Sequence, residues 1–335
     1  MTLEITKVQK ALNLPENWDS LAVDYFQTKE FLAHTEKYNP CNQRYFTLFQ
    51  DGIFKAGAIV YTLRLDLLTY LSLPSPFRMN IVGIPCSVSA SGMVGSFDLF
   101  FDLIDFIKIH EKGLLLVLNL DSNPLISDAT MGKTLPTIIL DNRFPSWENY
   151  QQSLKANYRR RLRHLSRPFW GINMKRGVCS RFDEKMYHQY REVLKRSKGK
   201  LETLSQNFFQ NLPSNFSLTA YYDQENLLGW YISTAFKEKY YFFLGGINYE
   251  KNKQFNTYFN ILFNVLREGI EKKGSVIDLG QTAEIPKMRL GGKVVEKFLL
   301  GYHSNWLLRK LLKAGKSILE YSTTVPETHV FRGVK

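Results

Sequence analysis

Hydrophobic residues recur along the first half of the chain with two spacings, one typical of helices and one typical of strands. Apolar positions three and four residues apart predict amphipathic helices, and Ser96 stands where it can cap one of them. Two strand-like runs flank Asp51-Gly52, a dipeptide typical of tight hairpins. We expect, in order, a helix over 20–38, a hairpin around Asp51-Gly52, a helix over 96–110 and buried strands over 114–120 and 135–140.

The second half repeats this order of elements, although no residue-level repeat is visible. We expect a strand over 217–223, a meander over 227–245, a helix over 256–273, a strand over 275–280, a short helix over 285–290, a strand over 294–302 and a basic helix over 306–321. The predicted fold class is therefore α/β (α+β), with two lobes that each have a mixed, mostly antiparallel sheet flanked by helices. The predicted divisions are 1–145, 146–212 and 213–335.

A very basic helical segment connects the two halves. Ser146 can cap its first helix, which is expected to continue to the residue before Pro168. Of the 44 lysines and arginines in this 335-residue chain, 15 lie in residues 151–200, beside only three acidic residues. The net charge of +13 is thus concentrated in one segment, which would attract phosphates of coenzyme A, nucleic acids, nucleotide sugars or lipid headgroups.

Several classes of protein are disfavoured by composition. The three cysteines, Cys41, Cys86 and Cys179, are far apart and show no metal-ligand spacing, so we expect neither a disulfide framework nor a metal. The six histidines show no pairing typical of a catalytic triad. No segment has the roughly 20 apolar residues of a membrane span, and the N-terminus lacks an apolar signal core. We therefore expect a cytoplasmic protein, with peripheral membrane contact left open.

Three segments resemble the tandem-GNAT acyltransferases around the FemAB aminoacyltransferases, the BioF2-like proteins and the peptidoglycan biosynthesis/recognition proteins. Residues 146–163 are similar to the family's W-x-x-Y…R-x-x-L-R helix. Residues 245–259 (GGIN leading to NTYF) are similar to the family's junction between the meander and the long helix. Residues 278–291 (DLGQTA, then K and LG) are similar to its late K-x-x-L/F-G element. The resemblance implies two GNAT-like lobes and an N-acyltransferase of the EC 2.3 class.

The resemblance places Lys287 at the acyl-transfer centre, where a cation can stabilise developing negative charge. Asp278 lies near the end of the preceding strand and Glu284 follows that strand. Both carboxylates are candidate general bases for the amine. A surface position for Lys287 and a dipole interaction for Glu284 are the structural alternatives. No metal or covalent intermediate is expected.

Candidate residues for binding the substrate or donor gather in the same segments. Arg159 and Arg163 are four residues apart and so share a helix face, where their guanidinium groups could bind phosphate; a solvated helix face is the alternative. Asn256 could simply cap a helix. The full set of binding candidates is Arg159, Arg163, Tyr158, Asn248, Asn256, Tyr258, Gln281 and Thr282.

The donor is expected to be an acyl thioester such as acyl-CoA or, alternatively, an aminoacyl-tRNA. No helical arm of the kind found in some FemAB proteins is present, which favours the thioester slightly. Residues 248–256, however, lack the glycines of the usual R/Q-x-x-G-x-G/A pyrophosphate loop. The acceptor would be a small, lipid-linked or nucleotide-linked amine.

Two non-enzymatic alternatives use the positive charge alone. One is nucleic-acid binding, including tRNA, through residues 151–200, although no RNA- or DNA-binding motif is present. The other is docking on an anionic membrane through the same segment and the helix that carries Arg309, Lys310, Lys313 and Lys316.

Overall fold

The computed structural model describes residues 2–64, 78–122, 126, 128–197, 202–316, 320–322 and 328–333. The chain forms two compact units, each assembled from segments that are distant in sequence. Unit 1 comprises Met1–Pro136, Leu201–Leu204 and Glu296–Thr323, and unit 2 comprises Thr137–Lys200, Ser205–Val295 and Thr324–Lys335. The division of the sequence at 145/146 and 212/213 stays a prediction.

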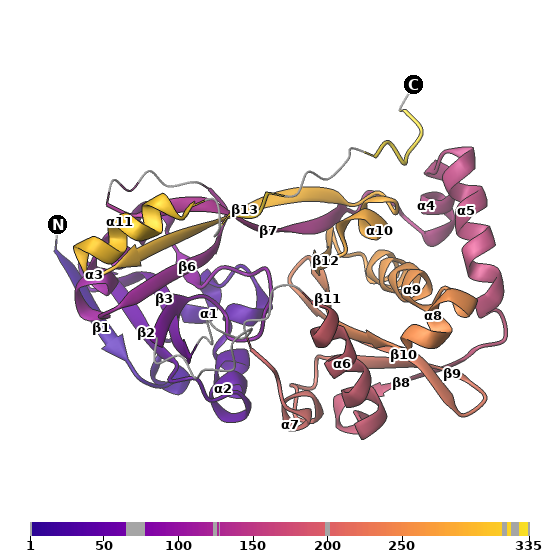
Figure 1. The fold of residues 1–335 in the computed structure, drawn as a ribbon, viewed down its shortest axis with the longest axis horizontal. Helices are drawn as coiled ribbons and strands as arrows, with labels where there is room; N and C mark the ends of the chain where they lie inside the picture. Colours follow the sequence, from indigo (N-terminus) through magenta and orange to yellow (C-terminus); the bar gives the residue numbers. More distant parts are fainter. Residues whose placement is uncertain are drawn as a thin grey trace. The chain divides into compact units, whose positions relative to one another are not determined.

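Unit 1 contains an antiparallel meander that is extended by one parallel strand (Figure 1). Strands β1 to β4 pair antiparallel in sequence order, β6 lies parallel to β4, and β13 pairs antiparallel with β6. The short strand β5 pairs with β3. The strands are β1 Leu3–Val8, β2 Arg44–Gln50, β3 Ile53–Arg64, β4 Arg78–Val82, β5 Met93–Gly95, β6 Leu114–Leu120 and β13 Lys293–His303.

Helices cover both faces of the unit 1 sheet. Neighbouring residues of β3 point to opposite faces, and two of them contact different helices. Ala58 packs in the same apolar cluster as Leu103 of α3. A Cβ at Gly57 would meet the ring of Trp18 of α1 at 2.3 Å, so a glycine is needed where that helix approaches. The helices are α1 Trp18–Leu21, α2 Lys29–Tyr38, α3 Phe100–His110 and α11 Trp306–Ala314.

Unit 2 repeats this plan. Strands β8 to β11 form an antiparallel meander, β12 lies parallel to β11, and β7 pairs antiparallel with β12. The strands are β7 Thr130–Asp141, β8 Asn173–Val178, β9 Ser217–Asp223, β10 Asn226–Phe236, β11 Lys239–Ile247 and β12 Val276–Gln281. The helices are α4 Trp147–Ser153, α5 Ala156–Ser166, α6 Glu184–Arg196, α7 Gln206–Gln210, α8 Tyr249–Phe255, α9 Thr257–Glu271 and α10 Glu284–Met288. The predicted mixed, mostly antiparallel sheets with flanking helices are confirmed.

Two helices sandwich the unit 2 sheet. The indole N–H of Trp230 donates to Met186 O of α6 at 3.1 Å, whereas the hydroxyl of the next residue, Tyr231, donates to Glu268 of α9 at 2.7 Å. Glu268 also accepts from Tyr240 and pairs with Arg176 of β8. A largely buried carboxylate is therefore fully engaged between α9 and the sheet.

The last strand of each unit comes from the other half of the sequence. Strand β7 follows β6 of unit 1, yet its residues 137–141 pair with β12 of unit 2. Strand β13 follows the helices of unit 2, yet its residues 298–303 pair with β6 of unit 1. The two halves thus exchange their final strands, which explains why each unit is discontinuous in sequence.

Two expected helices are broken in the structure. The helix expected to continue to Pro168 splits into α4 and α5, because Leu154 forms a β-bridge with Phe331 and the Lys155 N–H donates to Val330 O at 2.9 Å. The helix expected over 20–38 is divided into the end of α1, a 3-10 turn at Tyr25–Gln27 and α2, which begins only at Lys29. The helix expected over 256–273 is confirmed by α9, which begins directly after Asn256. Part of the helix expected over 306–321 lies outside the described residues, since 317–319 are not among them.

Candidate functional site

The late turn of unit 2 buries a lysine. Lys287 of α10 is 2% exposed, and its ammonium donates hydrogen bonds to the carbonyl oxygens of Gly280 at 3.0 Å and Gln281 at 2.7 Å. A lysine ammonium has three N–H donors, so these two bonds leave one donor for another group. The surface position considered for Lys287 is therefore wrong.

Burial changes the proton affinity of Lys287. Desolvation lowers its pKa to about 7, because a charged ammonium is poorly solvated in the interior, and the negative charges of Asp278 and Glu284 oppose this effect. At neutral pH the side chain therefore lies near its titration midpoint. A lysine in this state can both donate a hydrogen bond to an oxyanion and exchange a proton.

The backbone around the lysine adopts conformations that non-glycine residues seldom take. Thr282 has a φ of 62° and Ala283 a φ of 50°, directly before α10. For a β-branched residue such as threonine this geometry is unfavourable, on the order of 1–3 kcal/mol. The hydrogen bonds from Lys287 to the two preceding carbonyls hold this turn closed. Strain of this kind is typical of functional sites.

Two predicted carboxylates flank the turn in different ways. Asp278 Oδ1 accepts from Gly280 N at 2.7 Å and from Thr137 Oγ1 at 3.0 Å, which fixes the end of β12. Burial raises the pKa of Tyr258 above its ordinary value, and the charges of Tyr249 and then of Glu284, in the first turn of α10, add to this shift. Asp278 is therefore used structurally, and Glu284 lies near both the lysine and a tyrosine hydroxyl.

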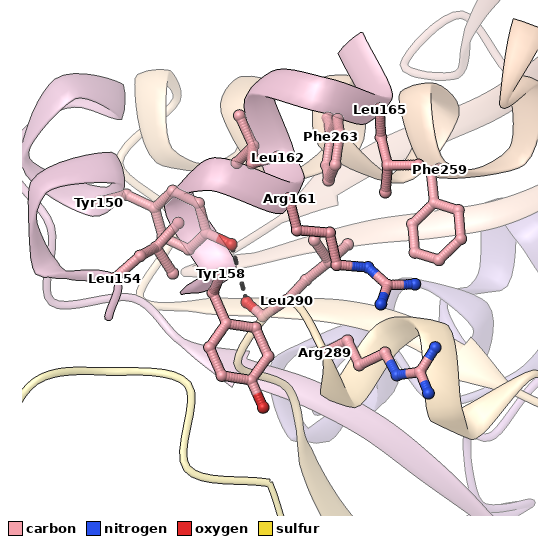
Figure 2. Close-up of a pocket in the computed structure, with 10 residues that line it drawn as sticks. All are labelled: Tyr150, Leu154, Tyr158, Arg161, Leu162, Leu165, Phe259, Phe263, Arg289 and Leu290. Carbon is pink, nitrogen blue, oxygen red and sulfur yellow. Dashed lines mark hydrogen bonds between the residues drawn. The ribbon is translucent and has the colours of Figure 1, made fainter. Parts of the chain in front are cut away.

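A pocket lies in unit 2 beside the residues that follow Lys287 (Figure 2). The hollow measures about 270 Å³ when the space open to solvent is included, but the centre of a water molecule can occupy only about 10 Å³ of it. The hydroxyl of Tyr150 donates to Leu290 O at 2.8 Å and so joins α4 to the segment after α10. The pocket is lined by Tyr150, Leu154, Tyr158, Arg161, Leu162, Leu165, Phe259, Phe263, Arg289 and Leu290.

Two guanidinium groups face the same side of this pocket (Figure 2). The Arg161 guanidinium lies over the ring of Phe259, 5.5 Å from its centroid, and Arg289 follows Lys287 by two residues. Within the described part of the chain, neither arginine has a carboxylate within 4.0 Å. The pocket thus combines apolar walls with two cationic groups that suit phosphate or carboxylate oxygens.

The predicted binding residues fall into two groups. Tyr158 lines the pocket, while Tyr258, Gln281 and Thr282 belong to the turn or to the start of α9 next to it. The others lie apart from the pocket lining: Arg159 is half-buried and donates to Gln152 O at 3.5 Å, Arg163 is exposed, Asn248 caps α8, and Asn256 connects α8 to α9.

Sequence reasoning missed Arg161 and Arg289. Arg161 belongs to the stripe 158, 161, 162 and 165, whose spacing marks one face of α5, so its direction could have been inferred from the neighbouring leucines. Arg289 gave no such signal, because its position depends on how α10 ends. Among the described residues, no group of three or more potential metal-ligating side chains is present, and no helix is long and apolar enough to cross a bilayer.

A further buried acid lies in unit 1 and was also missed. Desolvation raises the pKa of Glu202 to about 7, while hydrogen bonding from Ser87, whose Oγ lies 3.1 Å from Oε1, opposes the shift. The other oxygen, Oε2, is buried with no hydrogen-bond partner among the described residues. The two residues are 115 positions apart in sequence, so no local pattern indicates their contact.

Comparison with known proteins finds likeness at the level of the fold. No family model and no curated protein sequence matches the chain. Among solved structures it is similar to FemX (TM-score 0.52, 13% identity, covering 87% of this chain and 94% of that one). It is also similar to L-PGS from Bacillus licheniformis (TM-score 0.51, 13% identity, covering 91% and 96%). A tandem GNAT protein from the clavulanic acid biosynthesis pathway matches with a TM-score of 0.46 and 10% identity, covering 91% and 99%.

The chain therefore has a mixed α/β fold of two units, as predicted for its fold class. In particular, it shares the architecture of FemX and of L-PGS over nearly the whole of each chain. At 13% identity this likeness shows the fold, and the function has to be argued from the site itself.

Proposed function

We propose that this protein is an N-acyltransferase whose reaction centre is the Lys287 turn of unit 2. The observation that carries the proposal is a buried lysine with a pKa near 7, held by two backbone carbonyls, and followed closely in sequence by Arg289 and Leu290, which line a pocket with two guanidinium groups. In the reaction, the acceptor nitrogen attacks the acyl carbonyl and the bond to the leaving group breaks. The proton lost by the amine ends on the leaving group.

Each residue has a distinct role in this proposal. The protonated Lys287 donates its third N–H to the carbonyl oxygen as negative charge develops there. Glu284, whose negative charge acts on Lys287, accepts the proton of the acceptor amine. Arg161 and Arg289 bind anionic oxygens of the donor and so position its acyl group.

The first candidate for the donor is an acyl thioester such as acyl-CoA, whose phosphates would pair with the two pocket arginines. The second candidate, an aminoacyl-tRNA, is favoured by the start of α8. There Asn248 Oδ1 accepts from the N–H groups of Glu250 and Lys251 at 3.0 and 3.2 Å. In a pyrophosphate-binding loop such N–H groups donate to the ligand. Here they donate to Asn248, which disfavours pyrophosphate binding at this helix start.

Donor binding separates the two candidates. We would measure the affinity of the full chain for coenzyme A by calorimetry and for unacylated tRNA by filter binding at several salt concentrations. Arg161→Ala/Arg289→Ala should weaken binding of the true donor at least about tenfold, because two charge-assisted contacts are lost. The exposed Arg163→Ala is the matched control and should have a smaller effect. If the control weakens binding as much as the double variant, the pocket is not the donor site.

The reaction itself is tested by product analysis. The protein would be incubated with a panel of acyl-CoA thioesters or aminoacyl-tRNAs and a panel of amines, and amide products would be sought by mass spectrometry. The proposal expects an amide whose formation requires the protein. The absence of any amide with both classes of donor would contradict it.

A further inference from the structure

Helix α11 of unit 1 is apolar and basic and contributes nothing to the core. None of its nine residues is buried. Trp306, Leu307, Leu308 and Leu311 are exposed by 61%, 54%, 39% and 60%. Packing among the residues that the structure describes therefore does not account for four large apolar side chains on so short a helix.

The helix is nonetheless well formed and firmly attached. Asn305 caps it by accepting from the N–H groups of Leu307 and Leu308. Ser304 exchanges two hydrogen bonds with Gly113, at 2.9 and 3.1 Å. Arg309 lies over the ring of Tyr302 and contacts Asp128 at 3.3 Å. The exposed side chains thus project from a fixed element.

The leucines and the basic residues are segregated around α11. At 100° per residue, Leu307, Leu308, Leu311 and Leu312 occupy one arc of the helix. The basic residues Arg309, Lys310 and Lys313 occupy the opposite arc, and the helix contains no acidic residue. Trp306 lies within the basic arc, between Lys313 and Lys310, and the Lys310 ammonium lies over its ring, 4.7 Å from the centroid.

We propose that α11 docks the protein on the surface of an anionic lipid bilayer. Leucines on one face and basic residues on the other are the features of a helix that lies in the membrane interface. Nine residues of helix span about 14 Å, which is too short to cross the hydrocarbon core. The net charge of +13 complements acidic headgroups and opposes association of two copies of the chain.

Vesicle co-sedimentation of the full chain tests this proposal. Vesicles of equimolar phosphatidylglycerol and phosphatidylcholine should bind the protein, and pure phosphatidylcholine vesicles should bind it at least about tenfold more weakly. Leu307→Ser/Leu311→Ser should weaken binding to the anionic vesicles at least about tenfold. Ile109→Ser is the control, because Ile109 is equally exposed, at 67%, on α3. Equal binding by the double variant and the control would overturn the proposal.

A second measurement does not depend on the double variant. The fluorescence of Trp306 should shift to shorter wavelength on the anionic vesicles, and Trp306→Phe should remove that shift. Trp170→Phe, which changes an indole that is 74% exposed on unit 2, should leave the shift in place. An unchanged shift in Trp306→Phe would place the contact elsewhere and overturn the proposal.

Sedimentation equilibrium tests whether a second copy of the chain, instead of lipid, binds this face of α11. The proposal expects a monomer in the absence of lipid. A dimer that dissociates in Leu307→Ser/Leu311→Ser would show that the leucines bind a second copy of the chain instead. None of these experiments depends on catalysis, so they stand apart from the acyltransferase proposal.

Discussion

Replacing Lys287 by methionine should remove a pH dependence from the stability of the protein. The pKa of Lys287 falls from 10.5 to about 7 on folding, so the unfolded chain binds the proton more tightly than the folded protein between these pH values. The free energy of unfolding of the wild type should therefore rise with pH across this window, by about 1.4 kcal/mol per pH unit. The full shift corresponds to about 5 kcal/mol.

The comparison of the two proteins isolates this effect. Lys287→Met has no titrating group at this site, so between pH 7.5 and 9.5 the wild type should gain about 3 kcal/mol relative to the variant. Unfolding in urea, followed by intrinsic fluorescence, measures both curves. The exposed Lys253→Met of α8 is the control and should run parallel to the wild type. Parallel curves for Lys287→Met as well would refute the argument that burial controls this lysine.

Two further substitutions test other features of the structure. Glu202 has a folded pKa raised from 4.5 to about 7, so wild-type stability should fall as pH rises through this range, by up to about 3 kcal/mol, whereas Glu202→Gln should lack this fall in a pH series of urea unfolding. Gly291 has a φ of 90°, and a Cβ there would meet the Phe331 ring at 2.3 Å, whereas Gly171 has a φ of 85° and open space. Gly291→Ala should therefore lower the free energy of unfolding by about 1–3 kcal/mol more than Gly171→Ala, and equal losses would show that the ring simply moves away.

Local patterns were sufficient to predict most of the elements. The hairpin at Asp51-Gly52 forms with φ values of 49° and 78°, as that dipeptide allows. The periodicity of residues 96–110 is confirmed by α3, with Leu103, Ile104 and Ile107 buried. These features are determined by residues that are close in sequence, so a local sequence pattern is enough to predict them.

The parts that were not predicted depend on distant residues. The break between α4 and α5 is made by Leu154 and Phe331, and the exchange of β7 and β13 depends on pairing between strands far apart in the chain. The burial of Lys287 likewise requires the left-handed turn at Thr282 and Ala283, which neither residue favours by itself. A resemblance could point to the lysine, but only the structure shows its two carbonyl partners.

The pH dependence of kcat/KM for amide formation tests the central claim most directly, because it reports both the role and the protonation state of Lys287. For the wild type we expect kcat/KM to fall as pH rises through about 7, since the protonated ammonium is the form that stabilises the oxyanion. Lys287→Ala should lose that limb of the profile and be slower by about 100-fold at its optimum, while Lys253→Ala should match the wild type. A Lys287→Ala variant with the rate and the profile of the wild type would contradict the account.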